Sequence, residues 1–145
     1  LSINFKIAKN LQIPLFSWDS LSQFELQNIF DNSSAILDAI FGIGLNRALS
    51  DKYVSIIKFI NSLKTSPQSV KNKKIIFSID IPSGLDADTG EIYREAILAD
   101  YTLSFTAPKK CFTLKTCQKY YGTVKIFDIG IPKKFEQLFL QVKNK

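Results

Sequence analysis

Residues 74–90 read K-I-I-F-S-I-D-I-P-S-G-L-D-A-D-T-G, and this stretch decides the fold. Its first half is a short run of β-branched and aromatic residues that stops at Pro82-Ser83-Gly84. This composition predicts a buried strand that ends in a tight loop. Small ligands bind beyond the carboxyl ends of parallel strands, so Asp80 is placed to meet one. The alternative is an ordinary turn in which Asp and Ser side chains cap backbone amides, and the spacing alone leaves both readings open.

The same alternation of strands and helices extends outward along the chain. Apolar runs predict strands at residues 13–16, 35–41, 101–105 and 122–128. Helical spacing of apolar residues predicts helices over 3–10 and 50–63, and a helix or an irregular helical turn over 17–30. Residues 65–73 are polar and predict a surface loop, whereas residues 133–145 again place apolar side chains at helical spacing. This order predicts an α/β fold, namely a Rossmann-like three-layer α/β/α sandwich with a mostly parallel sheet.

The run at residues 35–41, A-I-L-D-A-I-F, is nearly all apolar, which is typical of a central parallel strand. Asp38 lies inside this run. A buried carboxylate is costly unless it is paired or bound to a cation. Asp38 is therefore either a functional carboxylate, such as a cation ligand, or a group that caps neighbouring backbone amides.

A loop with two glycines, G-I-G-L-N-R at residues 42–47, follows this predicted strand directly. Glycines let backbone amides approach a phosphate closely, and Asn46 and Arg47 add donors beside them. The pattern is G-x-G-x-x-R, so the dinucleotide fingerprint G-x-G-x-x-G is incomplete. By itself, this loop is a weak signal for phosphate binding.

Length, composition and charge limit the classes of protein to which the chain can belong. The 145 residues are 46% hydrophobic, which is enough for one domain with a core. No apolar run approaches the ~20 residues of a membrane helix, and the first residues do not form a signal peptide, so we expect a cytoplasmic protein without membrane contact. The net charge of +6 comes from scattered lysines, which favour a solvated surface over a nucleic-acid interface.

The residue types also limit the chemistry. The sequence contains no histidine, which excludes Ser-His-Asp and Cys-His catalysis and leaves acid–base work to carboxylates, lysines and tyrosines. Cys111 and Cys117 cannot form a zinc site by themselves. A disulfide between them is possible on spacing, but two buried thiols are the favoured reading in a reducing compartment.

Three motifs in this order resemble the NAD(P)H-hydrate epimerase family of the YjeF N-terminal domain type. They are D-A-I-F-G-I-G at residues 38–44, S-I-D-I-P-S-G-L-D-A-D-T-G at 78–90, and A-D-Y-T-L-S-F-T-A-P-K at 99–109, followed by F-D-I-G-I-P at 127–132. The resemblance covers about residues 8–132 and corresponds to the later part of the family's domain.

Members of that family interconvert the R and S forms of hydrated NADH and NADPH, which carry a hydroxyl at C6 of the nicotinamide ring. A partner dehydratase repairs only one of these forms, and the epimerases tend to form homodimers. The resemblance implies that Asp38 and Ser83 hold a potassium ion and that Asp80 contacts the hydrated ring. It assigns the phosphate-bearing body of the substrate to the loop at residues 42–48, which consists of Gly42, Ile43, Gly44, Leu45, Asn46, Arg47 and Ala48.

The reaction suits these residue types. Expulsion of the C6 hydroxyl leaves an iminium, and water can return to the opposite face of the ring. One carboxyl group can protonate the leaving hydroxyl and then deprotonate the incoming water. We expect Asp80 to take that role and Lys109, at a neighbouring strand end, to assist it.

One departure from the family pattern is clear. The family's domain begins with a helix and a strand that lead to an Asn-Asn-Gly-Gly-Asp loop, which does not occur here, and the chain starts at Leu1. We therefore expect residues 1–145 to form a single, N-terminally incomplete domain of the epimerase type. The alternative function is a non-catalytic nucleotide- or protein-binding module derived from this fold after loss of that loop.

Overall fold

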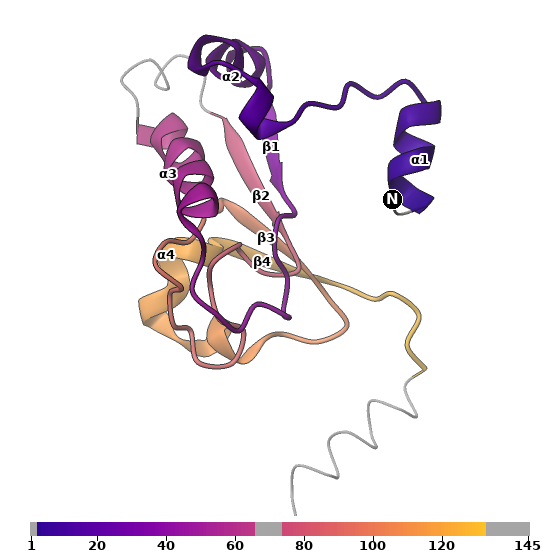
Figure 1. Ribbon diagram of the computed structural model, residues 1–145. Helices are drawn as coiled ribbons and strands as arrows, with labels where there is room; N and C mark the ends of the chain where they lie inside the picture. The colour runs from indigo at the N-terminus through magenta and orange to yellow at the C-terminus, as the bar shows by residue number, and fades with distance from the viewer. Residues whose placement is uncertain (1–2, 66–73, 133–145) are drawn as a thin grey trace, which may run out of the picture. The chain divides into compact units, whose positions relative to one another are not determined.

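The computed structural model describes residues 3–65 and 74–132, and its contacts divide the chain into two compact units, Leu1–Ser33 and Ser34–Lys145 (Figure 1). The predicted helix at the end of the chain and most of the predicted loop at residues 65–73 lie outside the described residues. Among the described helices, none combines the length and the apolar character that crossing a bilayer requires.

The first unit contains helix α1 (Ile3–Asn10), the short 3-10 helix η1 (Trp18–Ser20) and helix α2 (Gln23–Asp31). A capping box begins α2: the Ser22 hydroxyl accepts from the Glu25 backbone N–H at 3.3 Å, and the Glu25 carboxylate accepts from the Ser22 N–H at 2.8 Å. These two hydrogen bonds satisfy amides that a helix start otherwise leaves unpaired.

One expectation for this unit is wrong. Residues 13–16 form no strand, and Pro14 has no N–H to give to a sheet ladder. The helix or irregular helical turn expected over residues 17–30 is observed as η1 followed by α2, with Ser22 between them in extended backbone angles (φ −67°, ψ 161°) as the N-cap of α2.

The second unit is built on a four-stranded sheet in the order β1-β2-β3-β4, and every neighbouring pair is parallel. The strands are β1 (Ala35–Asp38), β2 (Ile75–Ile79), β3 (Tyr101–Phe105) and β4 (Thr123–Phe127). Helix α3 (Asp51–Thr65) connects β1 to β2, and the short helices η3 (Lys110–Thr113), η4 (Lys115–Cys117) and α4 (Gln118–Tyr121) precede β4. The α/β fold with a parallel sheet is therefore confirmed.

The place of β1 differs from the prediction. Within the described sheet it is an edge strand and not a central one. Its burial alternates, since Ile36 and Asp38 are buried whereas Leu37 is 62% exposed. It ends at Asp38, whose carboxylate accepts from the Ile40 N–H at 3.4 Å and turns the chain out of the ladder.

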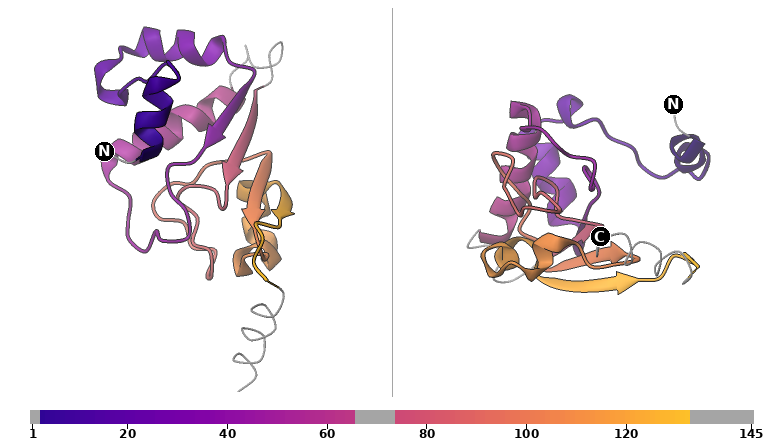
Figure 2. Two further views of the ribbon diagram at one scale, coloured as in Figure 1. Left: turned by 90° about the vertical axis from the view of Figure 1, so that its right-hand side faces the viewer. Right: turned by 90° about the horizontal axis from the view of Figure 1, so that it is seen from below.

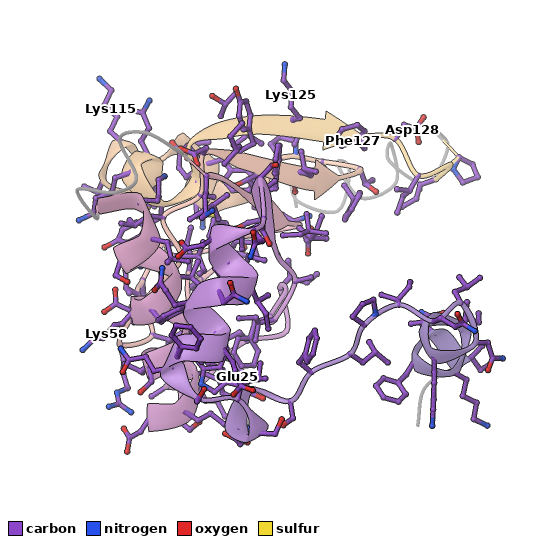
Figure 3. The ribbon with its side chains drawn as sticks, turned by 90° about the horizontal axis from the view of Figure 1, so that it is seen from above. Glu25, Lys58, Lys115, Lys125, Phe127 and Asp128 are labelled. Carbon is purple, nitrogen blue, oxygen red and sulfur yellow. The ribbon has the colours of Figure 1, made fainter. Side chains whose placement is uncertain are left out.

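One face of the sheet is covered by helices, whereas side chains on the other face are exposed or half-buried in the described part of this unit. Helices α3 and α4 lie on the same side of the sheet in the views of Figures 1 and 2. Ile36, Ile76, Ser78, Thr102 and Ser104 are buried, and they occupy alternate positions of β1, β2 and β3. The other face carries Leu37, Phe77, Tyr101 and Thr123, which the register aligns across the sheet. Lys125, two residues further along β4, projects away from the unit (Figure 3). The second helical layer of the predicted sandwich stays a prediction.

A compact core joins the loop that follows β2 to the short helices that precede β4. Its buried members are Ile81, Leu85, Ala96, Cys111, Cys117 and Tyr121. Both cysteines are free and buried, as expected from the sequence. Burial raises the pKa of the Cys111 thiol to about 12, so this thiol stays protonated and serves as an apolar core group.

Candidate functional site

Asp80 is held in an unusual backbone conformation immediately after β2. Its φ is +68°, in the left-handed region that non-glycine residues seldom adopt, although Asp tolerates it better than most. The Asp80 N–H donates to the Leu103 carbonyl oxygen at 2.8 Å, which fixes this residue against the middle of β3. Such conformations cluster at functional sites, where the surrounding structure maintains them. The positive φ therefore marks Asp80 as a functional candidate independently of its residue type.

The Asp80 carboxylate pairs with the ammonium group of Lys109. The Lys109 Nζ lies 2.9 Å from Asp80 Oδ1, and the Lys109 and Asp80 side chains are only 18% and 20% exposed. Lys109 Nζ also lies 3.4 Å from the Phe105 carbonyl oxygen at the end of β3. Because this pair is partly withdrawn from water, its attraction is stronger than that of a surface ion pair. The structure thus joins the two residues that the sequence proposes for acid–base chemistry.

A cavity of about 450 Å³ opens beside this pair. Its lining consists of Ile43, Asp80, Phe105, Thr106, Ala107, Pro108, Lys109 and Ile129. The cavity lies beyond the carboxyl ends of β2 and β3, where parallel α/β sheets bind ligands. Its volume is in the range of small-molecule sites. A largely apolar lining with one carboxylate and one ammonium suits a small ring with a hydroxyl that must exchange a proton.

Asp38 is the centre of a buried hydrogen-bond cluster. Its carboxylate accepts from the Ser78 hydroxyl at 2.8 Å, from the Ser83 N–H at 2.9 Å and from the Ser83 hydroxyl at 2.5 Å. Asp38 is 2% exposed, and both serines are completely buried. The Ser83 hydroxyl in turn accepts from the Phe41 N–H at 3.0 Å. The cluster ties the end of β1 to the loop after β2, so it fixes both loops beside Asp80.

The oxygens of this cluster are of the type that potassium binds. Asp38 and Ser83 approach each other as the family resemblance implies, and the Phe41 carbonyl oxygen lies 3.4 Å from the Ser83 hydroxyl. Carboxylate, hydroxyl and carbonyl oxygens are the hard ligands that such cations prefer. In the structure these oxygens satisfy one another through hydrogen bonds, so an ion bound there would replace part of that network. The donor chemistry fits potassium.

The loop at residues 42–48 contributes unequally to the cavity. Ile43 lines it, and a Cβ atom on Gly42 would lie 3.5 Å from Asp80 Oδ2, so the start of the loop reaches the candidate site. Gly44, Asn46, Arg47 and Ala48 are exposed, and Leu45 is half-buried. None of these five is among the residues that line this cavity. The structure brings Gly42 and Ile43 to Asp80 but does not bring the Asn46 and Arg47 donors there.

Asp86 lies in the motif at residues 78–90. It agrees with the alternative interpretation of that motif, in which Asp side chains cap backbone amides. Its Oδ1 accepts from the backbone N–H groups of Asp88 and Thr89 at 2.9 and 2.7 Å, and its Oδ2 accepts from the Tyr93 hydroxyl at 2.6 Å. The Tyr93 hydrogen bond, followed by the Thr89 amide, lowers the pKa of Asp86 to about 2. Asp86 therefore acts as a structural cap of its loop.

Gly84 explains why this loop can pack closely. Its φ is +94°, and a Cβ atom there would collide with the Glu95 carbonyl oxygen. Only glycine fits this backbone and this contact. Residues 95–96 therefore pack directly against the loop that carries Ser83.

Sequence reasoning missed two residues of the site. Ser78 is the register partner of Asp38 in the β1–β2 ladder and donates to its carboxylate. Its signal was a polar residue within an apolar strand, two positions before Asp80. Thr106 has a φ of +65° and lines the cavity, and the sequence around it gives no comparable sign of that backbone conformation.

Comparisons with known proteins identify the family of the chain. A family described as "YjeF-related protein N-terminus" matches residues 2–111. The chain is 39% identical over 135 residues to a bifunctional NAD(P)H-hydrate repair enzyme Nnr of Dictyoglomus turgidum, covering 91% of this chain and 23% of that protein. It is 37% identical over 131 residues to an NAD(P)H-hydrate epimerase of Oenococcus oeni, covering 89% of this chain and 53% of that protein.

A solved structure shares the architecture. The crystal structure of the yeast protein YNL200c matches with a TM-score of 0.67 and 25% sequence identity, covering 93% of this chain and 51% of the yeast chain. The chain thus spans about half of the yeast protein and of the Oenococcus epimerase, and about a quarter of the Dictyoglomus enzyme.

Proposed function

The chain belongs to the family described as YjeF-related protein N-terminus, and on that premise we propose that it is an isomerase that interconverts the R and S forms of hydrated NADH and NADPH. Relatives that match about nine-tenths of the chain carry the names NAD(P)H-hydrate epimerase and NAD(P)H-hydrate repair enzyme. The observation that carries the proposal is the Asp80–Lys109 pair beside a cavity at the carboxyl end of the sheet. In the described part of the chain, we find no observation that favours the non-catalytic module.

The pair contains both groups that the reaction needs. Loss of the C6 hydroxyl requires one proton and leaves an iminium, and the return of water to the opposite face releases one proton. In the ion pair, Lys109 holds a proton on Nζ while the Asp80 carboxylate can accept one. A proton passed through Asp80 to the leaving hydroxyl is recovered from the incoming water, so the site returns to its starting state. The proposed cycle consumes neither an oxidant nor a second substrate.

We also propose that Asp38 and Ser83 bind potassium, supported by the convergence of their oxygens with the Phe41 carbonyl oxygen. The ion would supply a positive charge that compensates the buried Asp38 carboxylate. Asp38 and Ser83 themselves orient the two loops beside Asp80, through hydrogen bonds that reach Ser78 and Phe41.

Four further features that the family resemblance implies are proposals. We propose a homodimer and a cytoplasmic, Rossmann-like enzyme, and the free thiols of Cys111 and Cys117 support a reducing compartment. We also propose a functional link to an NAD(P)H-hydrate dehydratase, which the word "bifunctional" in the name of the Dictyoglomus relative supports. Light scattering tests the dimer, and a monomeric mass at micromolar concentration would contradict it.

The activity is tested by a time course. Purified R-form NADH hydrate is incubated with the chain in potassium buffer, and the two forms are separated by chromatography. The proposal expects the R form to approach the R/S equilibrium faster than in buffer alone. Conversion at the spontaneous rate by a folded protein would contradict it.

A further inference from the structure

A second cavity adjoins the Asp80 site. It has a volume of about 490 Å³ and is lined by Ile43, Ala87, Asp88, Pro108, Lys109 and Lys110. Ile43, Pro108 and Lys109 also line the first cavity. The two cavities therefore meet along Lys109, and a ligand longer than one ring has room to extend from the first into the second.

The second cavity carries one ammonium that is not committed elsewhere. Lys109 is paired with Asp80, whereas the exposed Lys110 side chain makes no ion pair among the residues that the structure describes. An ammonium on the wall of a cavity is a ready partner for a phosphate oxygen.

Asp86 and Asp88 of the loop after β2 differ in their hydrogen bonds. Asp86 is saturated by Thr89, Tyr93 and the Asp88 backbone. The exposed Asp88 lines the cavity with Lys110. A carboxylate repels phosphate but accepts hydrogen bonds from sugar hydroxyls, as acidic residues do at ribose sites. The wall thus offers one group for an anion and a separate group for a sugar.

We propose that this second cavity binds the ribose-diphosphate body of the hydrated dinucleotide, with Lys110 paired to a diphosphate oxygen and Asp88 accepting from a ribose hydroxyl. The inference rests on the proposed function, since it assumes that the ring occupies the Asp80 cavity. It assigns the diphosphate to Lys110, although the sequence pointed to Asn46 and Arg47 as donors. Among the residues of the loop at 42–48, only Ile43 lines this cavity.

The first test separates binding from chemistry by kinetics. We expect Lys110→Gln to raise KM for R-form NADH hydrate about tenfold and to change kcat less than about twofold, because the lost charged hydrogen bond holds a part of the substrate that does not react. Lys115→Gln is the matched control: Lys115 is exposed on η4, projects outward in Figure 3, and is not among the residues lining either cavity. Equal KM values for the two variants would overturn the assignment while leaving the proposed function intact.

The second test does not depend on turnover. ADP-ribose has the ribose and diphosphate groups but no nicotinamide ring, and its binding is measured by calorimetry. We expect binding by the wild-type chain that weakens about tenfold in Lys110→Gln, weakens also in Asp88→Asn, and is unchanged in Lys115→Gln. Absence of binding by the wild-type chain, or equal binding by the Lys110 and Lys115 variants, would overturn the proposal whether or not the chain is an epimerase.

Discussion

Ser83 connects the two loops of the site through a single hydroxyl. It donates to the Asp38 carboxylate and accepts from the Phe41 N–H. Ser83→Ala leaves the buried carboxylate with one donor fewer and the Phe41 amide without a partner. We expect a loss of about 1–3 kcal/mol in the free energy of unfolding, measured in urea. Ser55→Ala, which removes an exposed helix hydroxyl, serves as the control and should change stability by less than about 0.5 kcal/mol.

The same variant tests the potassium proposal. We expect the wild-type chain to melt at a higher temperature in potassium chloride than in lithium chloride at equal concentration, because a ligand that binds only the folded state stabilises it. Ser83→Ala should remove this difference. A difference of equal size in the wild-type chain and in Ser83→Ala would contradict binding at this cluster.

Lys109 can act by its charge or by its proton, and two substitutions distinguish these roles. Lys109→Arg keeps a cation beside Asp80 but does not release a proton near neutral pH, whereas Lys109→Met removes both. If Lys109 supplies the proton, both variants should lose about 100-fold or more in kcat. Retention of most of the activity in Lys109→Arg would show that the positive charge alone suffices.

Asp86 contributes to stability in a defined range of pH. Hydrogen bonds from Tyr93 and Thr89 lower its pKa to about 2 from the ordinary value of 3.8. Because the pKa is lower in the folded chain, the stabilisation is fully present above the ordinary value and is lost as the pH falls through about 2. Tyr93→Phe should move the pKa of Asp86 back toward its ordinary value and weaken this pH dependence.

The Asp86 prediction is checked by carbon-13 NMR titration of the carboxyl group and by urea unfolding at pH 5 and pH 3. Asp86→Asn provides the reference in which this titration is absent. An unchanged Asp86 pKa in Tyr93→Phe would show that the Tyr93 hydroxyl is not the main cause of the shift.

At the scale of elements, β1 has one buried and one exposed side. Ile36 is 7% exposed and faces the covered side of the sheet, whereas its neighbour Leu37 is 62% exposed. We expect Ile36→Ala to cost about 2–5 kcal/mol of folding free energy and Leu37→Ala less than about 1 kcal/mol, measured by urea unfolding. Equal losses would mean that another layer covers Leu37 in solution.

The elements themselves were largely predictable. The apolar runs for β2, β3 and β4 and the apolar stripe of α3 lie in one stretch of sequence each, so local patterning was sufficient. The run at residues 13–16 shows the limit, because a strand needs a partner and local pattern does not provide one. The position of β1 at the edge was missed for the same reason: strand order depends on contacts between distant residues.

The site was predictable in parts. Asp80 and Lys109 each follow a recognisable strand, and loops after neighbouring parallel strands converge. Ser78 was missed because its contact with Asp38 joins residues 40 positions apart and depends on the ladder register. The convergence of Asp38 and Ser83 came from the family resemblance and not from their spacing, and the exposed placement of Asn46 and Arg47 could not be derived from the glycine pattern.

At the scale of the whole molecule, the candidate site belongs to one unit. Asp38, Ser83, Asp80 and Lys109 all lie within Ser34–Lys145 and are positioned by the ends of β1, β2 and β3. The chain spans only about half of the Oenococcus epimerase. The central question is therefore whether this chain catalyses the proposed epimerisation with the Asp80 carboxylate and the Lys109 ammonium.

The most direct test is the rate of R-to-S conversion of NADH hydrate by Asp80→Asn, compared with the wild-type chain and with Asp31→Asn, which alters an exposed carboxylate of α2. Chromatography of the two forms gives the initial rates, and circular dichroism verifies that all three proteins are folded. The account predicts that Asp80→Asn falls at least about 100-fold, toward the spontaneous rate, while Asp31→Asn keeps the wild-type rate. Conversion by Asp80→Asn at the wild-type rate would contradict the account.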